Sequence, residues 1–492
     1  MATEDVVLAT DGGALEQQRG EHTSDSQTGS IAAAFPLAIA NIRLDSLSPL
    51  PIHEQICQAI RAAIAAQELP PGALLPPSRE LALHLGVARN TVVYAYARLV
   101  AEGLCVSNTR RGTRIASDFP SRGASAKDHA GARSRLHLST RTAFHVQSAL
   151  GVAIDRMPDG TAFTLNASDP ALYPRTKLGR RIAGKYLDVT AKSQAPYGLA
   201  AAGATRFQTS LAAFLRSARG VVCAPQQIIP VTGLEGALDL TARVLLDPGD
   251  TVQVQDPAMD IVHGAFYAAR ANIVPIPTDA HGADPESVVG PPARLMFVAP
   301  SVSFPHGTQM SEQRRNAVLK AAYAQNAIIF ENDAYCELRY CGARLSSIQG
   351  LDGDGQVVYY SGFMETLGDS MNVGYLVVPE ALKDAFVEMN RRIANAPPPQ
   401  LQEAVAEFVE EHEYAFHARN VRGVYAERLE AVKQACKDLL PDFPTSEPNG
   451  GLFVVLRCSD HLDDVAICAE ATAEGVPVRP LSRYYAARAP ER

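Results

Sequence analysis

Hydrophobic side chains recur at helical spacing in residues 49–117, the first part of the chain with a sustained pattern. Isoleucines at positions 52, 56, 60 and 64 lie four residues apart, which predicts a helix with a single apolar side. The sequence Leu-Pro-Pro-Gly at 69–72 interrupts this pattern, and its prolines and glycine predict that the chain turns there.

Two more helices and a hairpin are predicted after this turn. Ser78 precedes a helical run and is expected to cap it, because its hydroxyl can accept a hydrogen bond from a free backbone amide. That helix should stop at Gly86, and a third should begin near Ala88 and end at Gly103. Residues 105–115 alternate between apolar and polar and predict a two-stranded hairpin. Together these parts indicate a winged helix-turn-helix.

From about residue 150 onward, helical segments alternate with short apolar runs typical of strands. Helices are expected at 205–216, 236–246 and, with a break at the prolines 397–399, over 381–433. Strands are expected at 227–231, 251–254, 294–298, 327–330, 356–360 and 376–378. This alternation predicts an α/β fold with a mixed, mostly parallel sheet and flanking helices.

A small terminal subdomain is expected after this sheet. Strands at 451–456 and 476–479 would enclose a helix at 465–474.

Two segments lack such periodicity and divide the chain into parts. Residues 1–45 are rich in Gly, Ser, Thr, Gln and acids and are expected to be a disordered tail, with one short apolar piece at 31–42 able to pack locally. Residues 118–148 are weakly basic, and their composition predicts a flexible linker. The folded parts are then the winged helix at 49–117 and an α/β domain at 150–492.

The charge distribution favours a nucleic-acid partner for the first folded part only. The whole chain of 492 residues has a net charge of −8, while residues 49–117 carry seven Arg and four Glu, or 7 − 4 = +3. These arginines are Arg61, Arg79, Arg89, Arg98, Arg110, Arg111 and Arg114. The third helix opens with Arg89, Asn90 and Thr91 and carries Tyr94 on the same side, placed to meet phosphates and base edges in a major groove.

Cysteine usage and hydropathy indicate a cytoplasmic protein. The 8 Cys are scattered and none has CxxC spacing, which favours reduced thiols over a zinc or other metal site. No apolar run approaches a membrane span, and the acidic N-terminus lacks the basic region of a signal peptide.

The first folded part resembles the DNA-binding module of the GntR family. The matching stretch is LPPSRELALHLGVARNTVVYAYARLVAEGLCVSNTRRGTRIA. The resemblance implies that double-stranded DNA is contacted by Arg79, Arg89, Asn90, Thr91, Tyr94, Arg111, Gly112 and Thr113. Ala88 replaces a serine that is usual in the family, which removes one hydrogen bond to phosphate.

The second folded part resembles class I aminotransferases of fold type I, the pyridoxal phosphate (PLP) transferase fold. The motifs are DPALYP at 169–174, VTGLEGALDL at 231–240, LLDPGDTVQVQDP at 245–257, APSVSFPHG at 299–307 and ENDAYCELRY at 331–340. A GntR unit fused to such a domain is the layout of MocR-type transcription regulators, whose fold and homodimeric state are therefore expected. Family members usually continue with a strand and a helix, so a shortened C-terminus is expected.

The segment 359–375, YYSGFMETLGDSMNVGY, resembles the one that anchors PLP in that family. Glu365 occupies the position of the lysine that forms the imine, and Met364 and Asn372 occupy those of the serine and arginine that hold the phosphate. Glutamate has no amine, and a carboxylate repels a dianionic phosphate.

The other positions implied for the cofactor are also changed, with one exception. Asn332 replaces the aspartate against the pyridine nitrogen, and its neighbour Asp333 should point to the opposite side of the strand. The phosphate-side Ser-Gln of the turn is Leu234-Glu235, and the ring-stacking Gly-Tyr is Ala258-Met259. Tyr335 retains the tyrosine that contacts the ring oxygen.

The expected protein is thus a DNA-binding transcription regulator whose aminotransferase-like domain holds no PLP or other cofactor and has no enzymatic activity. That domain would dimerise, and either Glu235, Glu365 and Asn332 line a site for a cationic or neutral effector or the pocket is unused. Two other interpretations stay open. The chain is a PLP-binding regulator or an aminotransferase with a non-covalent cofactor, or it is a partner protein that no longer binds DNA.

Overall fold

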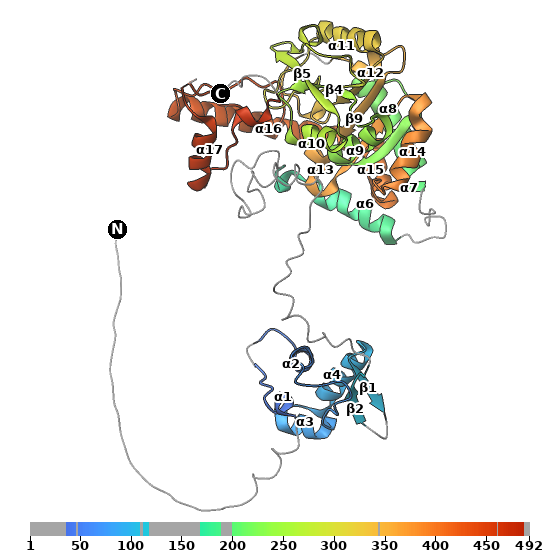
Figure 1. Ribbon diagram of the computed structural model, residues 1–492, viewed down its shortest axis with the longest axis vertical. Coiled ribbons are helices and arrows are strands. Elements are labelled where there is room, and N and C mark those ends of the chain that lie inside the picture. Colours follow the sequence, from blue (N-terminus) through green and yellow to red (C-terminus); the bar gives the residue numbers. More distant parts are fainter. Residues whose placement is uncertain are drawn as a thin grey trace, which may run out of the picture. The chain divides into compact units, whose positions relative to one another are not determined.

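The computed structural model describes residues 36–45, 48–108, 112–117, 168–187, 199–342, 345–459 and 461–486. The chain separates into unit 1, Met1–Leu136, and unit 2, His137–Arg492 (Figure 1). Each unit has a hydrophobic core of its own, so each is described by itself.

Unit 1 contains four helices and one hairpin among its described residues. They are α1 Leu37–Ala40, α2 Ile52–Ala65, α3 Ser78–Leu85, α4 Arg89–Ala101, β1 Cys105–Asn108 and β2 Gly112–Ile115. Strands β1 and β2 pair antiparallel, with Cys105 opposite Ile115. The apolar side of α2 is formed by Ile56, Ile60 and Ile64, which are buried against α4. The predicted winged helix-turn-helix is confirmed.

The start of α3 differs from the prediction. Ser78 is the first helical residue, its side chain makes no capping hydrogen bond, and Pro77 occupies the cap position. The Pro77 carbonyl accepts hydrogen bonds from the amides of Glu80 and Leu81 at 2.9 and 3.0 Å, so the helix begins one residue early. The end is as predicted, because Gly86 has a φ of 65°, a left-handed conformation that glycine adopts without strain.

Residues 36–42 pack locally, as expected for the apolar piece, but together with residues 43–45 they are part of unit 1 and not of a disordered tail. Ile39 and Ile42 are buried in the core of unit 1, and the Ala40 carbonyl lies 3.1 Å from the ring nitrogen Nε2 of His84. The side chain of Gln55 donates a hydrogen bond to the Asp45 carbonyl at 3.0 Å. Burial of two isoleucines favours order here, so the folded unit begins before residue 49. Residues 1–35 and the predicted linker lie outside the described residues.

Unit 2 contains a sheet and helices in alternation. The helices are α6 Arg175–Leu187, α7 Leu199–Ala202, α8 Thr205–Arg219, α9 Gly233–Leu245, α10 Asp260–Ala268, α11 Glu312–Gln325, α12 Ile348–Leu351, α13 Met364–Leu367, α14 Lys383–Arg392, α15 Pro399–Glu410, α16 Glu413–Leu439 and α17 Asp464–Ala473. The strands are β3 Ile228–Thr232, β4 Thr251–Asp256, β5 Asn272–Asp279, β6 Gly282–Ala283, β7 Leu295–Val298, β8 Ile328–Asn332, β9 Val357–Gly362 and β10 Val373–Val377.

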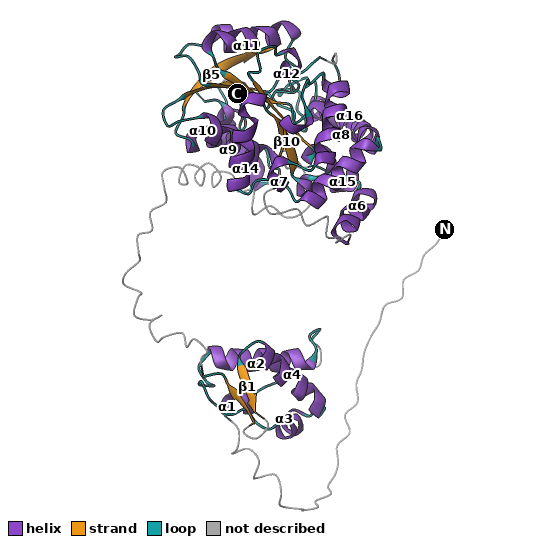
Figure 2. Ribbon diagram, turned by 90° about the vertical axis from the view of Figure 1, so that its right-hand side faces the viewer, coloured by secondary structure: helices purple, strands orange, loops and turns teal. Residues whose placement is uncertain are grey.

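The described strands of unit 2 form one eight-stranded sheet in the order β3-β10-β9-β8-β7-β4-β5-β6. The pairs among β5, β4, β7, β8 and β9 are parallel, whereas β10 runs antiparallel to both β9 and β3. Figure 2 shows these strands in the middle of the unit with helices on both sides. The predicted mixed, mostly parallel sheet with flanking helices is confirmed.

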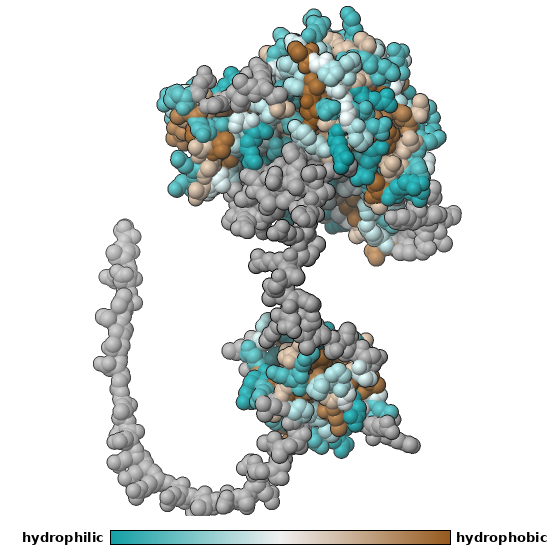
Figure 3. All heavy atoms as spheres, viewed as in Figure 1, coloured by the Kyte–Doolittle hydropathy of each residue, from teal (hydrophilic) through white to brown (hydrophobic). Residues whose placement is uncertain are grey.

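Alternating side chains supply the two cores on the faces of this sheet. Val358 and Tyr360 belong to the core that includes α9 and α10, while Tyr359 between them belongs to the core that includes α8 and α15. The register therefore fixes which residues of a strand face which layer of helices. On the face shown in Figure 3, described hydrophobic residues are interspersed with hydrophilic ones. No helix within the described ranges combines the length and apolar character that a bilayer crossing needs.

The predicted terminal strands at 451–456 and 476–479 are wrong. Within the described residues this region forms only isolated bridges, such as Thr445 with Leu456 and Arg339 with Gly450. Gly451 has a φ of 94°, which breaks the extended backbone at the start of the first segment. The helix between the two segments is present as α17.

A buried ion pair joins α8 to β8 in unit 2. The guanidinium of Arg219 donates two hydrogen bonds to the Asp333 carboxylate, at 2.7 and 3.1 Å, and both side chains are almost fully buried. Ser301 accepts a further bond from Arg219 at 2.7 Å, and the Tyr359 hydroxyl donates to Asp333 at 2.8 Å. Removing one partner of such a buried ion pair lowers the stability of the fold strongly, because the other charge stays buried without an opposite charge.

We expect Asp333→Ala to lower the free energy of unfolding of unit 2 by about 3–5 kcal/mol, because it leaves the Arg219 charge buried alone. The measurement is the shift in the urea denaturation midpoint. Asp239→Ala is the matched control, since it removes a half-exposed partner of Arg243 and should cost about 0–1 kcal/mol. Equal effects of the two changes would contradict the role given to the buried pair.

Candidate functional site

Helix α4 separates its side chains into a buried and an exposed side. Arg89, Asn90 and Tyr94, which the sequence nominates for DNA contacts, are exposed, and Thr91 is half-buried. The opposite side, with Val92, Ala95, Tyr96 and Leu99, is buried against α2 and α3. The polar opening of the helix is therefore available on one surface of unit 1.

Two tyrosines of α4 are held in different ways. The buried Tyr96 donates a hydrogen bond to the Pro76 carbonyl at 2.9 Å, which ties α4 to the turn before α3. The exposed Tyr94 meets the ring of His53 edge-on, with ring centroids 4.7 Å apart. Arg79, near the start of α3, is exposed as well. Among the described residues, no ion pair involves Arg79 or Arg89, so both guanidinium groups are free for a partner.

The tip of the wing is described only in part. Gly112 is exposed with a φ of 76°, and the Thr113 hydroxyl donates to that of Ser107 at 3.4 Å. Arg111, predicted to contact DNA, and Arg110 lie outside the described residues.

Two of the arginines counted in the charge of residues 49–117 are neutralised by neighbouring carboxylates. Arg61 pairs with Glu54 and Glu102 at 3.0 and 2.6 Å, and Arg98 pairs with the same two carboxylates at 2.6 and 3.3 Å. These four charges neutralise one another on the α2–α4 side of unit 1, so Arg61 and Arg98 do not add to a free basic surface. Arg114 keeps its charge while donating to the Gly72 carbonyl at 3.1 Å.

The residues at the expected cofactor ring position come together at the end of β8. Asn332 and Tyr335 are buried and line a narrow gap with Ala258, Met259 and Phe304. The free space in this gap is about 10 Å³, which is enough for about one water molecule. Asp333 points to the other face of the sheet, as the strand alternation predicted.

Glu365 places a buried carboxyl at the position where the resemblance implied a lysine. Burial raises the pKa of Glu365 to about 7, a hydrogen bond from its own amide lowers it, and Asp369 raises it further. After burial, Glu365 is also the strongest influence that raises the pKa of Tyr335 and of Tyr360. Within the described ranges, no Lys or Arg side chain is paired with this carboxylate. We call the space around Asn332, Tyr335, Tyr360 and Glu365 the cofactor cup. Its side chains therefore include a carboxylic acid and phenols.

The phosphate end of the cup is closed by a neutral side chain. A Cβ added at Gly233, the first residue of α9, would lie 2.2 Å from Oδ1 of Asn372, so that amide occupies the space over the turn. Leu234 is half-buried, and Glu235 is exposed on the first turn of α9. Met364 is half-buried, and its carbonyl accepts a hydrogen bond from Ser168 at 3.3 Å.

The residues in this cup do not fit PLP. PLP chemistry uses an amine for the imine, cationic donors for a dianionic phosphate and an acid beside the ring nitrogen. The chain offers Glu365, Asn372 and Asn332 at these places, and the gap at the ring position beside Asn332 has a free volume of only about 10 Å³. No lysine lies between Lys320 and Lys383 in the sequence.

We call residues 359–375 the anchoring segment. Ser168 and Tyr173 contact it, and the sequence did not predict these contacts. Ser168 donates to the Asp369 carboxylate at 2.6 Å. The Tyr173 ring covers Gly368 so closely that an added Cβ would lie 2.6 Å from it, and Gly368 has a φ of 112°. The motif at 169–174 could have pointed to this contact, because the same motif carried the family resemblance.

Metal binding has no support in the described parts of the chain. The eight cysteines are free, and the described residues contain no group of three or more His, Cys, Asp or Glu side chains able to hold a metal ion.

Comparisons with known proteins agree with both units. The gntR family of bacterial regulatory proteins matches residues 52–115, and the aminotransferase class I and II family matches residues 182–492. The chain therefore belongs to the MocR-type transcription regulators, which join a GntR-type helix-turn-helix to an aminotransferase-like domain.

Individual relatives match over nearly their whole length. The probable rhizopine catabolism regulatory protein MocR of Rhizobium meliloti is 33% identical, over 90% of this chain and 89% of that protein. The pyridoxine biosynthesis transcriptional regulator PdxR of Corynebacterium glutamicum is 26% identical, over 91% of this chain and 92% of that protein.

Solved aminotransferases share the fold of unit 2. An archaeal alanine:glyoxylate aminotransferase superposes with a TM-score of 0.64 at 24% identity, covering 72% of this chain and 91% of that one. LysN, the α-aminoadipate aminotransferase of Thermus thermophilus, has a TM-score of 0.62 at 22% identity, covering 72% and 90%.

The raised pKa of Glu365 predicts a pH dependence of stability. A carboxyl whose pKa rises from 4.5 to about 7 on folding gives stability that is present below pH 4.5 and lost as the pH rises through 7. Relative to Glu365→Gln, the unmodified chain should lose up to about 3 kcal/mol of unfolding free energy between about pH 5 and about pH 8. The measurement is urea denaturation of unit 2 at both pH values.

Glu286→Gln is the matched control, because Glu286 is exposed to water in unit 2. The difference in unfolding free energy between this variant and the unmodified chain should not grow with pH to a comparable extent. A Glu365→Gln difference that stays constant from acid to base would show that the carboxyl is not buried as described.

Proposed function

We propose that this chain is a sequence-specific DNA-binding transcription regulator in which α4 reads the major groove. The observation that carries this proposal is the free polar opening of α4, with Arg89 and Asn90 exposed and without internal partners among the described residues. Arginine can donate two hydrogen bonds to guanine and asparagine can make two with adenine, so both suit base edges in that groove. A regulator that acts on DNA is expected to work in the cytoplasm, and we propose that location for this chain.

We infer that Arg79, Thr91 and the wing around Gly112 and Thr113 position this helix on the phosphate backbone. Hydroxyl and guanidinium donors near helix starts are suited to phosphate oxygens. Tyr94 would contact the duplex from a ring orientation supported by His53. Arg111 is assigned to the same backbone contact from the sequence alone.

Unit 2 is proposed to act as an effector-binding and dimerisation domain without PLP and without aminotransferase activity. The support is the replacement of amine, phosphate donors and ring acid by Glu365, Met364, Asn372 and Asn332. The acidic character of the cup disfavours a phosphorylated cofactor and suits a cationic or neutral molecule.

We also propose a homodimer. Winged helices commonly read paired half-sites, and a two-fold axis in the protein matches a two-fold axis in such an operator. The aminotransferase-like unit supplies the surface for this pairing in our proposal, since the small unit 1 is occupied by its DNA contacts.

Replacing Arg89 by Ala should weaken specific DNA binding by about 1–3 kcal/mol if this side chain reads a base edge. The measurement is a mobility shift on the promoter of the chain's own or a neighbouring gene, at several salt concentrations. Arg61→Ala is the control from the same unit, because Arg61 is paired with Glu54 and Glu102 and should leave the affinity nearly unchanged. Unchanged affinity of the Arg89 variant would refute the role of α4.

Added PLP should form no imine with the anchoring segment, because residue 365 has no amine. The measurement is the absorbance spectrum of the purified chain with PLP, followed by borohydride reduction and mass spectrometry of the peptide covering 359–375. Glu365→Lys returns an amine to the same position and serves as the positive control for the reduction step. A stoichiometric, reducible complex of the unmodified chain would overturn the proposed loss of PLP.

A further inference from the structure

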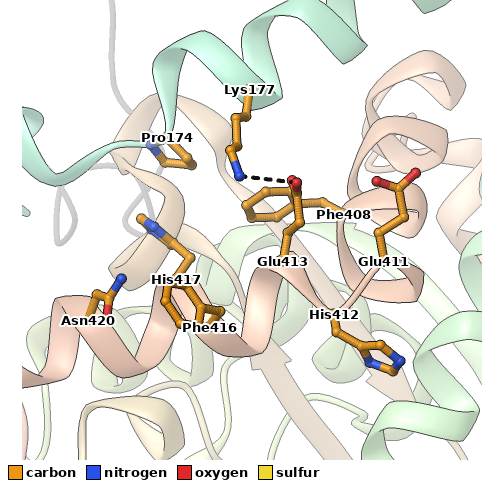
Figure 4. Close-up of a pocket in the computed structure, with 9 residues that line it drawn as sticks. All are labelled: Pro174, Lys177, Phe408, Glu411, His412, Glu413, Phe416, His417 and Asn420. Carbon is orange, nitrogen blue, oxygen red and sulfur yellow. Dashed lines mark hydrogen bonds and ion pairs between the residues drawn. The ribbon is translucent and has the colours of Figure 1, made fainter.

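Unit 2 has a second hollow, built by α6, α15 and α16 and lined by none of the residues of the cofactor cup (Figure 4). Its volume is about 400 Å³, against about 10 Å³ in the ring gap of the cup. Pockets for small molecules span roughly 300–1,000 Å³. We call it the α16 pocket, and it is lined by Pro174, Lys177, Phe408, Glu411, His412, Glu413, Phe416, His417 and Asn420.

The α16 pocket has an aromatic floor and an aromatic wall. Phe408 is fully buried beneath it, and its ring centroid lies 6.2 Å from that of His417. Phe416 is 69% exposed, although a phenyl ring that size gains free energy when an apolar partner removes it from water. Phe416 therefore offers an apolar body a contact on the surface of unit 2, above the buried Phe408.

The charges at the pocket cancel. Lys177 pairs with Glu413 at 3.1 Å, and Arg181 beside the pocket pairs with Glu411 at 2.6 Å and Glu413 at 3.1 Å. Two cations and two carboxylates leave no net charge. The Lys177 side chain is 68% exposed, and an exposed ion pair contributes little to stability, so its ammonium can turn to another carboxylate at little cost.

His417 contributes a hydrogen-bond acceptor. Its Nε2 lies 2.8 Å from the Thr366 carbonyl, and since a carbonyl only accepts, Nε2 is the donor. Burial lowers the pKa of His417, so the ring is neutral near pH 7 and Nδ1 keeps a lone pair. Thr366 follows Glu365, so the pocket lies directly behind the anchoring segment.

We propose that the α16 pocket binds a small zwitterion with an aromatic or aliphatic body, its carboxylate on Lys177 and its ammonium on Glu413. The body lies against Phe416, above the buried Phe408. A purely cationic ligand would meet Lys177, and a purely anionic one would meet Glu411 and Glu413, whereas a zwitterion satisfies both signs at once. The proposal deepens the effector role proposed for unit 2, on which its regulatory meaning rests, while binding is measured directly.

The first test uses the absence of tryptophan from this chain. Phe416→Trp places a single fluorophore in the pocket, and L-phenylalanine or L-leucine should change its emission along a saturating curve. Leu439→Trp puts the same fluorophore on the same helix at a position that is 78% exposed and outside the pocket, and its emission should stay constant. Parallel changes in both variants, or none in either, would overturn the proposal.

The second test is isothermal titration of the full chain without a reporter. L-Phenylalanine should bind at least ten-fold more tightly than phenethylamine, which lacks the carboxylate, and than 3-phenylpropionate, which lacks the ammonium. Lys177→Ala should weaken L-phenylalanine at least ten-fold, while Lys320→Ala on α11 should not. Equal binding of all three compounds, or no heat with either amino acid, would refute the zwitterion site. DNA binding is read separately by mobility shift, so failure of this site leaves the proposed regulator intact.

Discussion

The arrangement of unit 2 depends on the ion pair between Arg219 and Asp333. Taking two charges out of water is costly, and the cost is offset here by the hydroxyls of Ser301 and Tyr359 as well as by the pair itself. Because the end of β8 is fixed by these bonds, its register is fixed too. Asn332, one residue earlier, must then face the opposite layer, where the cofactor cup lies.

The core on one face of the sheet includes side chains of the ring gap, among them Ala258, Phe304 and Tyr335. Phe297 stacks on Phe330 with centroids 5.7 Å apart, and Phe330 stacks on Tyr360 at 6.2 Å. These rings stabilise the centre of the sheet without help from a phosphate or an imine. Position 365 can therefore hold a buried glutamate at a local electrostatic cost while the fold is kept.

Periodicity predicted the elements well, and contacts distant in sequence account for most of the rest. The winged helix, the mixed sheet and the orientation of Asp333 toward the face opposite Asn332 follow from repeats of two to four residues. The pairing of Arg61 with Glu102 joins residues 41 positions apart, and nothing local distinguishes this arginine from Arg89. The α16 pocket was not foreseen for the same reason, because it needs α6 beside the junction of α15 and α16.

The close contact between the Tyr173 ring and Gly368 determines how a pulling force on the chain would reach the cofactor cup. Helix α6 buries only Leu178, and ion pairs make most of its contacts with α15 and α16. The Tyr173 ring, just before α6, packs much more closely against Gly368. Along the described chain, tension applied at residue 168 would thus act on Ser168 and Tyr173 before it reached α6. Together they contact residues at the two ends of α13, the short helix that carries Glu365, so a load on the chain would reach the cup before it reached the sheet.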